Sequence, residues 1–248
     1  MKAMVLAAGL GTRLRPLTND RPKALVEVAG RTLLEMVLTR LKTFGVREVI
    51  VNVHHFADMV VEYLAARENF GMRIEISRED ELLDTGGGLK KAGWFFLEGS
   101  SKDEPFYLHN VDVISTIDLG RMLEFHRSRQ ALATLAVQDR GTSRYLLFND
   151  AGELCGRRAG NDGAVEWARK VGRFEARAFS GIHVISPRLL TMLSEDGAFS
   201  IVASYLRLAG GGERVIAFPA DEYSWRDLGR VESVREAEAD LKTSTERP

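Results

Sequence analysis

The stretch Ala3-Met4-Val5-Leu6-Ala7-Ala8-Gly9-Leu10-Gly11-Thr12-Arg13-Leu14, near the start of the chain, decides the fold. Its first six residues are apolar, and a short apolar run that ends in glycines is typical of a strand buried on both faces. We therefore predict a parallel strand over residues 3–8, followed by a loop. In an open α/β sheet, ligands bind beyond the carboxyl ends of such strands.

Further along the chain, strand patterns and helical patterns alternate. Apolar residues at helical spacing predict helices, and short or alternating apolar runs predict strands. Strands are expected at residues 48–53, 72–76, 106–108, 132–137, 178–186 and 214–218, and helices at 34–44, 56–64, 89–97, 119–126 and 231–241. This alternation implies βαβ units with right-handed crossovers. We expect an α/β, three-layer, Rossmann-like fold with a mixed, mainly parallel sheet.

The middle of the chain, residues 139–177, departs from this pattern. It is polar and carries six glycines, Gly141, Gly152, Gly156, Gly160, Gly163 and Gly172. A structureless segment of that length is uncommon in a compact domain. We therefore expect short antiparallel strands inserted over one end of the sheet. The predicted organisation is a single domain over residues 1–242, which includes this insertion, and a frayed tail at 243–248.

Composition excludes several classes of function. The chain has 248 residues and a formal net charge of −1, so it shows no basic footprint for nucleic acid or an anionic membrane. Its single cysteine, Cys155, cannot build a disulfide framework. It contains no signal-peptide pattern and no apolar run of about 18 residues. We expect a cytoplasmic protein that binds neither nucleic acid nor membrane.

The loop at residues 9–14 suits a phosphate group. Gly9 and Gly11 let backbone N–H groups approach phosphate oxygens, and Arg13 adds a charged fork. Lys23, ten residues later, is a point charge that could reach the same phosphates. A dinucleotide-dependent oxidoreductase is disfavoured, because Leu14 stands where its third glycine belongs. The residues alone also allow a simple turn with solvated cations.

The two segments Leu6–Thr18 and Pro22–Leu25 closely resemble the nucleotide-binding motif of sugar-1-phosphate nucleotidyltransferases, also called nucleotide-sugar pyrophosphorylases. The resemblance extends from Met1 to about Leu241 and implies the fold of that family. It implies that the loop binds the nucleotide through Ala7, Ala8, Gly9, Gly11 and Thr12. It also implies catalytic roles for Arg13 and Lys23 in neutralising the charge of the triphosphate.

A second glycine cluster, Asp84-Thr85-Gly86-Gly87-Gly88-Leu89, precedes a predicted helix. Three glycines there are costly unless something approaches the backbone. A tight loop without a ligand is the alternative. In the family, similar loops lie against the base, so the resemblance assigns Gly86 and Gly87 to nucleotide binding. This stretch is most similar to the muramic-acid and mannose-type branch.

Two aspartates are candidate metal ligands. Asp112, in Asn110-Val111-Asp112, follows a predicted strand, and Asp227 stands in Trp225-Arg226-Asp227-Leu228-Gly229. Taken alone, each is an ordinary cap or turn residue, although Mg²⁺ is usually held by one or two carboxylates plus substrate phosphates. The resemblance implies that both aspartates are ligands of Mg²⁺ and that Asp112 is also catalytic. It implies further that Asn110 binds the nucleotide. Val111 replaces the family's usual glycine, which implies a narrower space beside the sugar, and Arg230 replaces a frequent threonine.

Weaker matches to the family suggest a sugar pocket at Gly181, Ser143 and Glu166. The implied reaction joins a nucleoside triphosphate, with UTP favoured, to a sugar 1-phosphate and releases pyrophosphate, without a covalent intermediate. GTP with a mannose or heptose phosphate is the alternative. An alternative that is not an enzyme is a catalytically inactive regulator that binds nucleotide sugars. The replacement of the usual glycine by Val111 is compatible with such a loss of activity. We expect a monomer or a homodimer.

Overall fold

The computed structural model describes residues 1–98 and 104–245. Its described residues group into two compact units. Unit 1 contains Met1–Leu82, His109–Ser115 and the segment that begins at Trp225. Unit 2 contains Leu83–Leu108 and Thr116–Ser224. Strand β6 (Phe106–Asn110) passes along the chain from unit 2 into unit 1.

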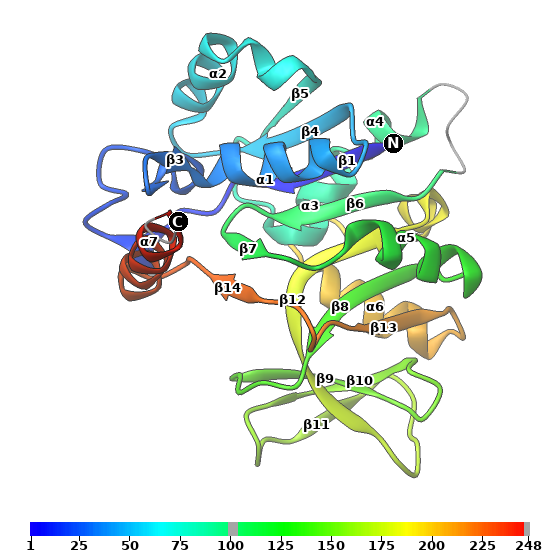
Figure 1. Cartoon of the computed structure of the whole chain (residues 1–248). Coiled ribbons are helices and arrows are strands. Elements are labelled where there is room, and N and C mark those ends of the chain that lie inside the picture. The colour runs from blue at the N-terminus through cyan, green and yellow to red at the C-terminus, as the bar shows by residue number, and fades with distance from the viewer. Residues whose placement is uncertain (99–103, 246–248) are drawn as a thin grey trace. The chain divides into compact units, whose positions relative to one another are not determined.

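Unit 1 is built on three parallel strands that lie side by side (Figure 1): β1 (Lys2–Leu6), β4 (Glu48–Val53) and β5 (Arg73–Arg78). Met4 pairs with Ile50, which pairs in turn with Glu75. Nearly all residues of β1 and β4 are buried, as is typical of inner strands in a parallel sheet. The run at residues 3–8 is therefore confirmed as a buried parallel strand, which ends at Leu6.

Helices and short elements complete unit 1. Helix α1 (Leu33–Thr43) buries an apolar stripe and begins at the N-cap Thr32, whose side chain accepts from the N–H of Glu35. The other elements are α2 (Ala57–Ala66), α7 (Val231–Thr245), the 3₁₀ turns η1 (Thr12–Leu14), η2 (Lys23–Leu25) and η3 (Glu68–Gly71), the hairpin of β2 (Glu27–Val28) with β3 (Arg31–Thr32), and the antiparallel pair of β7 (Val113–Ser115) with β14 (Trp225–Asp227).

Unit 2 contains a mixed arrangement of strands. β8 (Ala133–Gln138) pairs parallel with β13 (Val215–Pro219) and antiparallel with β12 (Glu175–Ile185), which also pairs with β9 (Arg144–Phe148). β9 continues antiparallel to β10 (Leu154–Ala159), and β10 to β11 (Val165–Trp167). Its helices are α3 (Asp84–Lys91), α4 (Trp94–Leu97), α5 (Leu119–Ser128), η5 (Pro187–Met192) and α6 (Ile201–Gly210).

These elements confirm the predicted α/β class with a mixed sheet. The polar middle of the chain folds as the antiparallel strands β9, β10 and β11, as expected. Asp118 is the N-cap of α5, because its side chain accepts from the N–H of Arg121 at 2.9 Å. Among the described residues, no helix is long and apolar enough to span a membrane.

Three details differ from the sequence-based expectations. Helix α6 was not expected, although Ser200 caps it and its buried residues follow a helical stripe. The second glycine cluster lies inside α3, not before it. Helix α7 continues to Thr245, past its predicted end at Leu241, and the last three residues of the predicted tail lie outside the described residues.

Candidate active site

The site begins where β1 ends. The N–H of Val111 donates to the carbonyl of Leu6 at 3.1 Å, so the segment after β6 continues alongside the end of β1. This bond places Asn110 and Asp112 near the glycine loop at the carboxyl edge of parallel strands, where α/β sheets bind ligands. Val111 itself is buried, and its effect on the space beside the sugar stays a prediction.

The glycine loop holds a conformation that favours glycine at one position. Gly11 has φ +65°, and an added Cβ there would approach Cγ2 of Thr18 to 2.9 Å. Its carbonyl accepts from the hydroxyl of Thr18 at 2.8 Å and from the N–H of Leu14 at 2.8 Å. These bonds close the loop into η1, which carries Arg13 on its exposed side. Ala7 and Ala8 are buried, while Gly9 is exposed.

Lys23 and Asp112 form an ion pair across 89 positions of sequence, between Nζ and Oδ2. Lys23 is the first residue of η2, and the ring of the N-cap residue before it, Pro22, restricts its own φ to −70°. The exposed fractions of the two side chains are 14% and 13%. The attraction is therefore partly shielded from solvent and stronger than that of a surface pair. The two predicted charges thus meet, as the sequence-based hypothesis requires.

Asp227 reaches the same place through the β7–β14 pair. In this antiparallel register Asp227 lies opposite Val113, the residue after Asp112. The N–H of Leu228 also donates to the carbonyl of Asp112 at 2.8 Å. Backbone pairing therefore brings together two aspartates that are 115 positions apart in the sequence, independently of their side chains.

Gly229 shows how closely the polar groups converge. An added Cβ on this residue would lie 2.8 Å from Oδ1 of Asp227 and 3.2 Å from Oδ2 of Asp112. It would also lie 3.0 Å from Nη2 of Arg13. Three charged side chains from three distant segments thus line one small space, and glycine leaves that space open. The N–H of Gly229 donates to Oδ1 of Asp227 at 2.7 Å, which orients this carboxylate.

The donor set of this space fits Mg²⁺ held jointly by protein and substrate. Among the residues that the structure describes, no group of three or more His, Cys, Asp or Glu side chains could hold a metal ion. Two carboxylates without a full protein cage are typical of Mg²⁺ bound together with substrate phosphates. Lys23 stands in ion-pair contact with one of these carboxylates.

His109 adds no charge to the site. It is fully buried on β6, and burial lowers its pKa to about 4. Its Nδ1–H donates to the carbonyl of Asn110 at 2.8 Å. At neutral pH the ring is therefore uncharged.

Gly86 and Gly87, in unit 2, have a packing reason to be glycine. Added Cβ atoms would lie 2.3 Å from the ring of Phe199 and 2.4 Å from the carbonyl of Gly197. Both N–H groups donate to the carbonyl of Phe199, at 2.8 and 3.3 Å. Glycines at these positions indicate that some group lies close to the backbone, and that group is the segment containing Gly197 and Phe199, in the same unit. Nucleotide binding by these glycines stays a prediction.

The three residues suggested for the sugar pocket also lie in unit 2. Gly181 has φ +73° at the point where the register of β12 with β8 shifts, so a bulge accounts for this glycine. Ser143 is exposed just before β9, and its carbonyl accepts from the N–H of Gly160. Glu166 is exposed on β11 and pairs with Arg157 at 2.7 Å. No contact of these residues points to a sugar, and their roles stay predictions.

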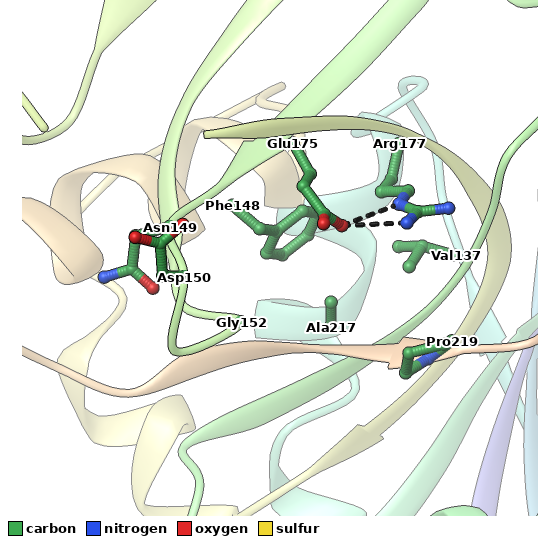
Figure 2. Close-up of a pocket in the computed structure, with 9 residues that line it drawn as sticks. All are labelled: Val137, Phe148, Asn149, Asp150, Gly152, Glu175, Arg177, Ala217 and Pro219. Atoms are coloured by element: carbon green, nitrogen blue, oxygen red, sulfur yellow. Dashed lines mark hydrogen bonds and ion pairs between the residues drawn. The ribbon is translucent and has the colours of Figure 1, made fainter. Parts of the chain in front are cut away.

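Unit 2 also contains a cavity of about 140 Å³ beside the turn between β9 and β10. Figure 2 shows Glu175 and Arg177 side by side at its edge, where the guanidinium donates to the carboxylate at 2.8 and 3.2 Å. Hydrogen bonding to Glu175 raises the pKa of Arg177. None of the nucleotide-binding, sugar-binding or metal-ligand candidates from the sequence lines this cavity.

Two polar residues beside the glycine loop, Asn52 and Glu79, were not predicted from the sequence. Asn52, on β4, accepts from the N–H of Ala7 through Oδ1 at 2.7 Å, and it donates to Glu79 at 2.7 Å. Both side chains are buried. The available signal was Asn52 as the single polar residue in the apolar run VIVNV at residues 49–53, because a buried polar group is more informative than an exposed one.

The fold, with two aspartates, an arginine and a lysine gathered beyond a glycine loop, defines a nucleotidyltransferase of the α/β class. Comparison with known proteins agrees: residues 2–146 match the nucleotidyl transferase family. The chain belongs to this family, and it is an enzyme of the nucleotidyltransferase type.

The chain is similar to two relatives in sequence and to a solved structure in fold. It is 38% identical to N-acetylmuramate alpha-1-phosphate uridylyltransferase of Caulobacter vibrioides, over 96% of both chains. It is 40% identical to mannose-1-phosphate guanylyltransferase 1 of Arabidopsis thaliana, over 55% of this chain and 38% of that one. A solved UDP-glucose pyrophosphorylase from Acinetobacter baumanii shares the fold, with a TM-score of 0.80, 18% identity, and coverage of 99% of this chain and 94% of that one.

Proposed function

We propose that the protein transfers the uridylyl group of UTP to a sugar 1-phosphate, with N-acetylmuramate α-1-phosphate as the acceptor, and releases pyrophosphate. The observation that carries the reaction type is the convergence of Asp112, Asp227 and Arg13 around Gly229. The similarity over 96% of both chains to a uridylyltransferase of that specificity supports the choice of substrates.

In this reaction a phosphate oxygen of the sugar phosphate attacks the α-phosphorus of the triphosphate in line, and pyrophosphate leaves. No protein atom needs to bond to the nucleotide, so the chain contributes position and charge. The loop offers the backbone N–H groups of residues 8–12 to the triphosphate, because the N–H of Ala7 already donates to Asn52, and Gly11 gives the loop its turn. Arg13, as a bidentate donor, steadies the departing pyrophosphate.

Mg²⁺, whose use is typical of this family, supplies further charge neutralisation when it is held by Asp112 and Asp227. Lys23 pairs with Asp112 in the free protein and lies within reach of the same space. We assign it two successive partners: the carboxylate before substrate arrives, and the α- and β-phosphates afterwards. Its positive charge thus balances negative charge in both states.

A substrate panel tests this proposal. The four common nucleoside triphosphates are each combined with the 1-phosphates of N-acetylmuramate, glucose, mannose and a heptose, with Mg²⁺, and pyrophosphate release is measured. We expect the highest kcat/KM for UTP with N-acetylmuramate α-1-phosphate. Omission of Mg²⁺ should abolish release. Binding of the sugar nucleotide without any pyrophosphate release would instead support an inactive regulator.

The alternative substrate pair is GTP with mannose 1-phosphate. It is favoured by the 40% identity to a mannose-1-phosphate guanylyltransferase over 138 residues, which are 55% of this chain. The same panel separates the two, because turnover with GTP alone would contradict the choice of UTP. Discrimination between closely related bases or sugars rests on a few contacts, each worth about 1–3 kcal/mol. The ratio of kcat/KM between the two substrate pairs therefore decides which pair the enzyme uses.

A further inference from the structure

We propose that Asn52 and Glu79 are positioning residues for nucleotide binding: a buried hydrogen-bond relay from Glu79 through Asn52 to the N–H of Ala7 fixes the start of the glycine loop. This inference rests on the proposed function, because it assigns the relay to the same nucleotide loop. All three residues lie in unit 1.

The first link replaces a strand hydrogen bond that the sheet cannot supply. Leu6 is the last residue of β1 that pairs with β4, and its partner there is Asn52. At Ala7 the chain leaves the sheet, and its N–H would be buried without a backbone partner. Oδ1 of Asn52 accepts from this N–H at 2.7 Å. Because Ala7 is only 5% exposed, water is a poor substitute for this acceptor.

The second link fixes which way the amide of Asn52 points. Its Nδ2 donates to Oε1 of Glu79 at 2.7 Å, and the two side chains are 2% and 4% exposed. An ionised carboxylate can only accept hydrogen bonds, so Glu79 selects the orientation in which Nδ2 faces it and Oδ1 faces Ala7. The N–H of Glu79 in turn donates to the carbonyl of Val53 at 2.8 Å, which ties the relay to β4.

The relay reaches the proposed binding groups directly. Ala7 is one residue before Ala8 and two before Gly9, so its peptide sets the direction in which the following N–H groups point. A small displacement of these donors weakens every bond they make to a phosphate. The effect of losing the relay should therefore appear mainly in nucleotide affinity, and less in the KM for the sugar phosphate at saturating UTP.

A swap of the two polar groups tests the relay. Asn52→Asp keeps the acceptor for Ala7 but removes the donor and sets two carboxylates face to face. Asn52→Asp with Glu79→Gln restores one donor and one acceptor, with the donor now on residue 79. Glu79→Gln alone keeps the relay, because the carbonyl of Gln can accept from Asn52. The dissociation constant for UTP with Mg²⁺ is measured for wild type and all three variants in the same buffer.

We expect Asn52→Asp to weaken UTP binding by about tenfold or more, and the double variant to return to within about threefold of wild type. Exchange of the Ala7 amide proton, followed by NMR in the free protein, should accelerate in Asn52→Asp and slow again in the double variant. A wild-type affinity in Asn52→Asp, or a double variant as weak as that single variant, would overturn the relay. If wild type fails to bind UTP, the proposed function is contradicted, and the Ala7 exchange rates still decide the relay.

Discussion

Asp112→Asn is expected to lower kcat by at least about a hundredfold while the protein stays folded. The substitution keeps the shape of the side chain and removes the negative charge that would hold Mg²⁺. It also leaves Lys23 without its ionic partner, but the amide oxygen of Asn can still accept a hydrogen bond from the ammonium, so the expected loss of stability is small. The carbonyl of Asp112, which accepts from the N–H of Leu228, is unaffected by the change.

Pyrophosphate release under saturating substrates measures the loss, and thermal unfolding measures integrity. The unfolding temperature should fall by no more than about 4 °C, which corresponds to about 1 kcal/mol for a chain of this size. Asp162→Asn, at an exposed position in unit 2, is the matched control and should keep wild-type turnover. Near-normal turnover of Asp112→Asn would remove Asp112 from the metal role.

Gly229→Ala is expected to lower kcat by at least about tenfold with almost no change in the unfolding temperature. The added methyl would enter the space between Asp227, Asp112 and Arg13, at 2.8–3.2 Å from their polar atoms. These atoms stand at the ends of side chains and can move away at little cost to folding, but Oδ1 of Asp227 then shifts relative to the N–H of residue 229 that orients it. The loss therefore falls on the geometry that holds the metal and phosphates.

A second alanine variant serves as the control for this experiment. Gly172 has open space where a Cβ would be added and no positive φ, so Gly172→Ala should keep wild-type kinetics and stability. Equal turnover of Gly229→Ala and wild type would show that the space beside Gly229 is not used by the reaction. A large drop in the unfolding temperature of Gly229→Ala would attribute its loss of turnover to destabilisation of the fold and not to the geometry of the site.

The sequence predicts those parts of the site that depend on local patterns. The run at residues 3–8 identifies β1 because its apolar residues are continuous, and the positions of Gly11, Arg13 and Lys23 follow from a long, specific motif. Asp118 caps α5 through its own side chain, a role that its residue type favours. Such features depend on a few residues that are neighbours in the sequence, so they can be predicted from the sequence alone.

The sequence does not show how distant segments meet. The β7–β14 pair has three residues in each strand, too short for a period to be recognised, yet its register is what places Asp227 beside Asp112. The glycines at 86 and 87 signalled a close approach, but only the fold shows that Phe199 and Gly197 make it. The relay through Asn52 similarly depends on the pairing of β1 with β4, which sequence spacing does not specify.

Binding of Mn²⁺, a spectroscopic substitute for Mg²⁺, in the presence of UTP tests the central claim most directly. Electron paramagnetic resonance measures free Mn²⁺ with wild type, Asp112→Asn and Asp227→Asn at equal protein and UTP concentrations. We predict that wild type with UTP holds Mn²⁺ more tightly than UTP alone does, and that each single variant loses at least about tenfold of this affinity. If both variants hold Mn²⁺ as tightly as wild type does, the two carboxylates beside Gly229 do not form the metal site.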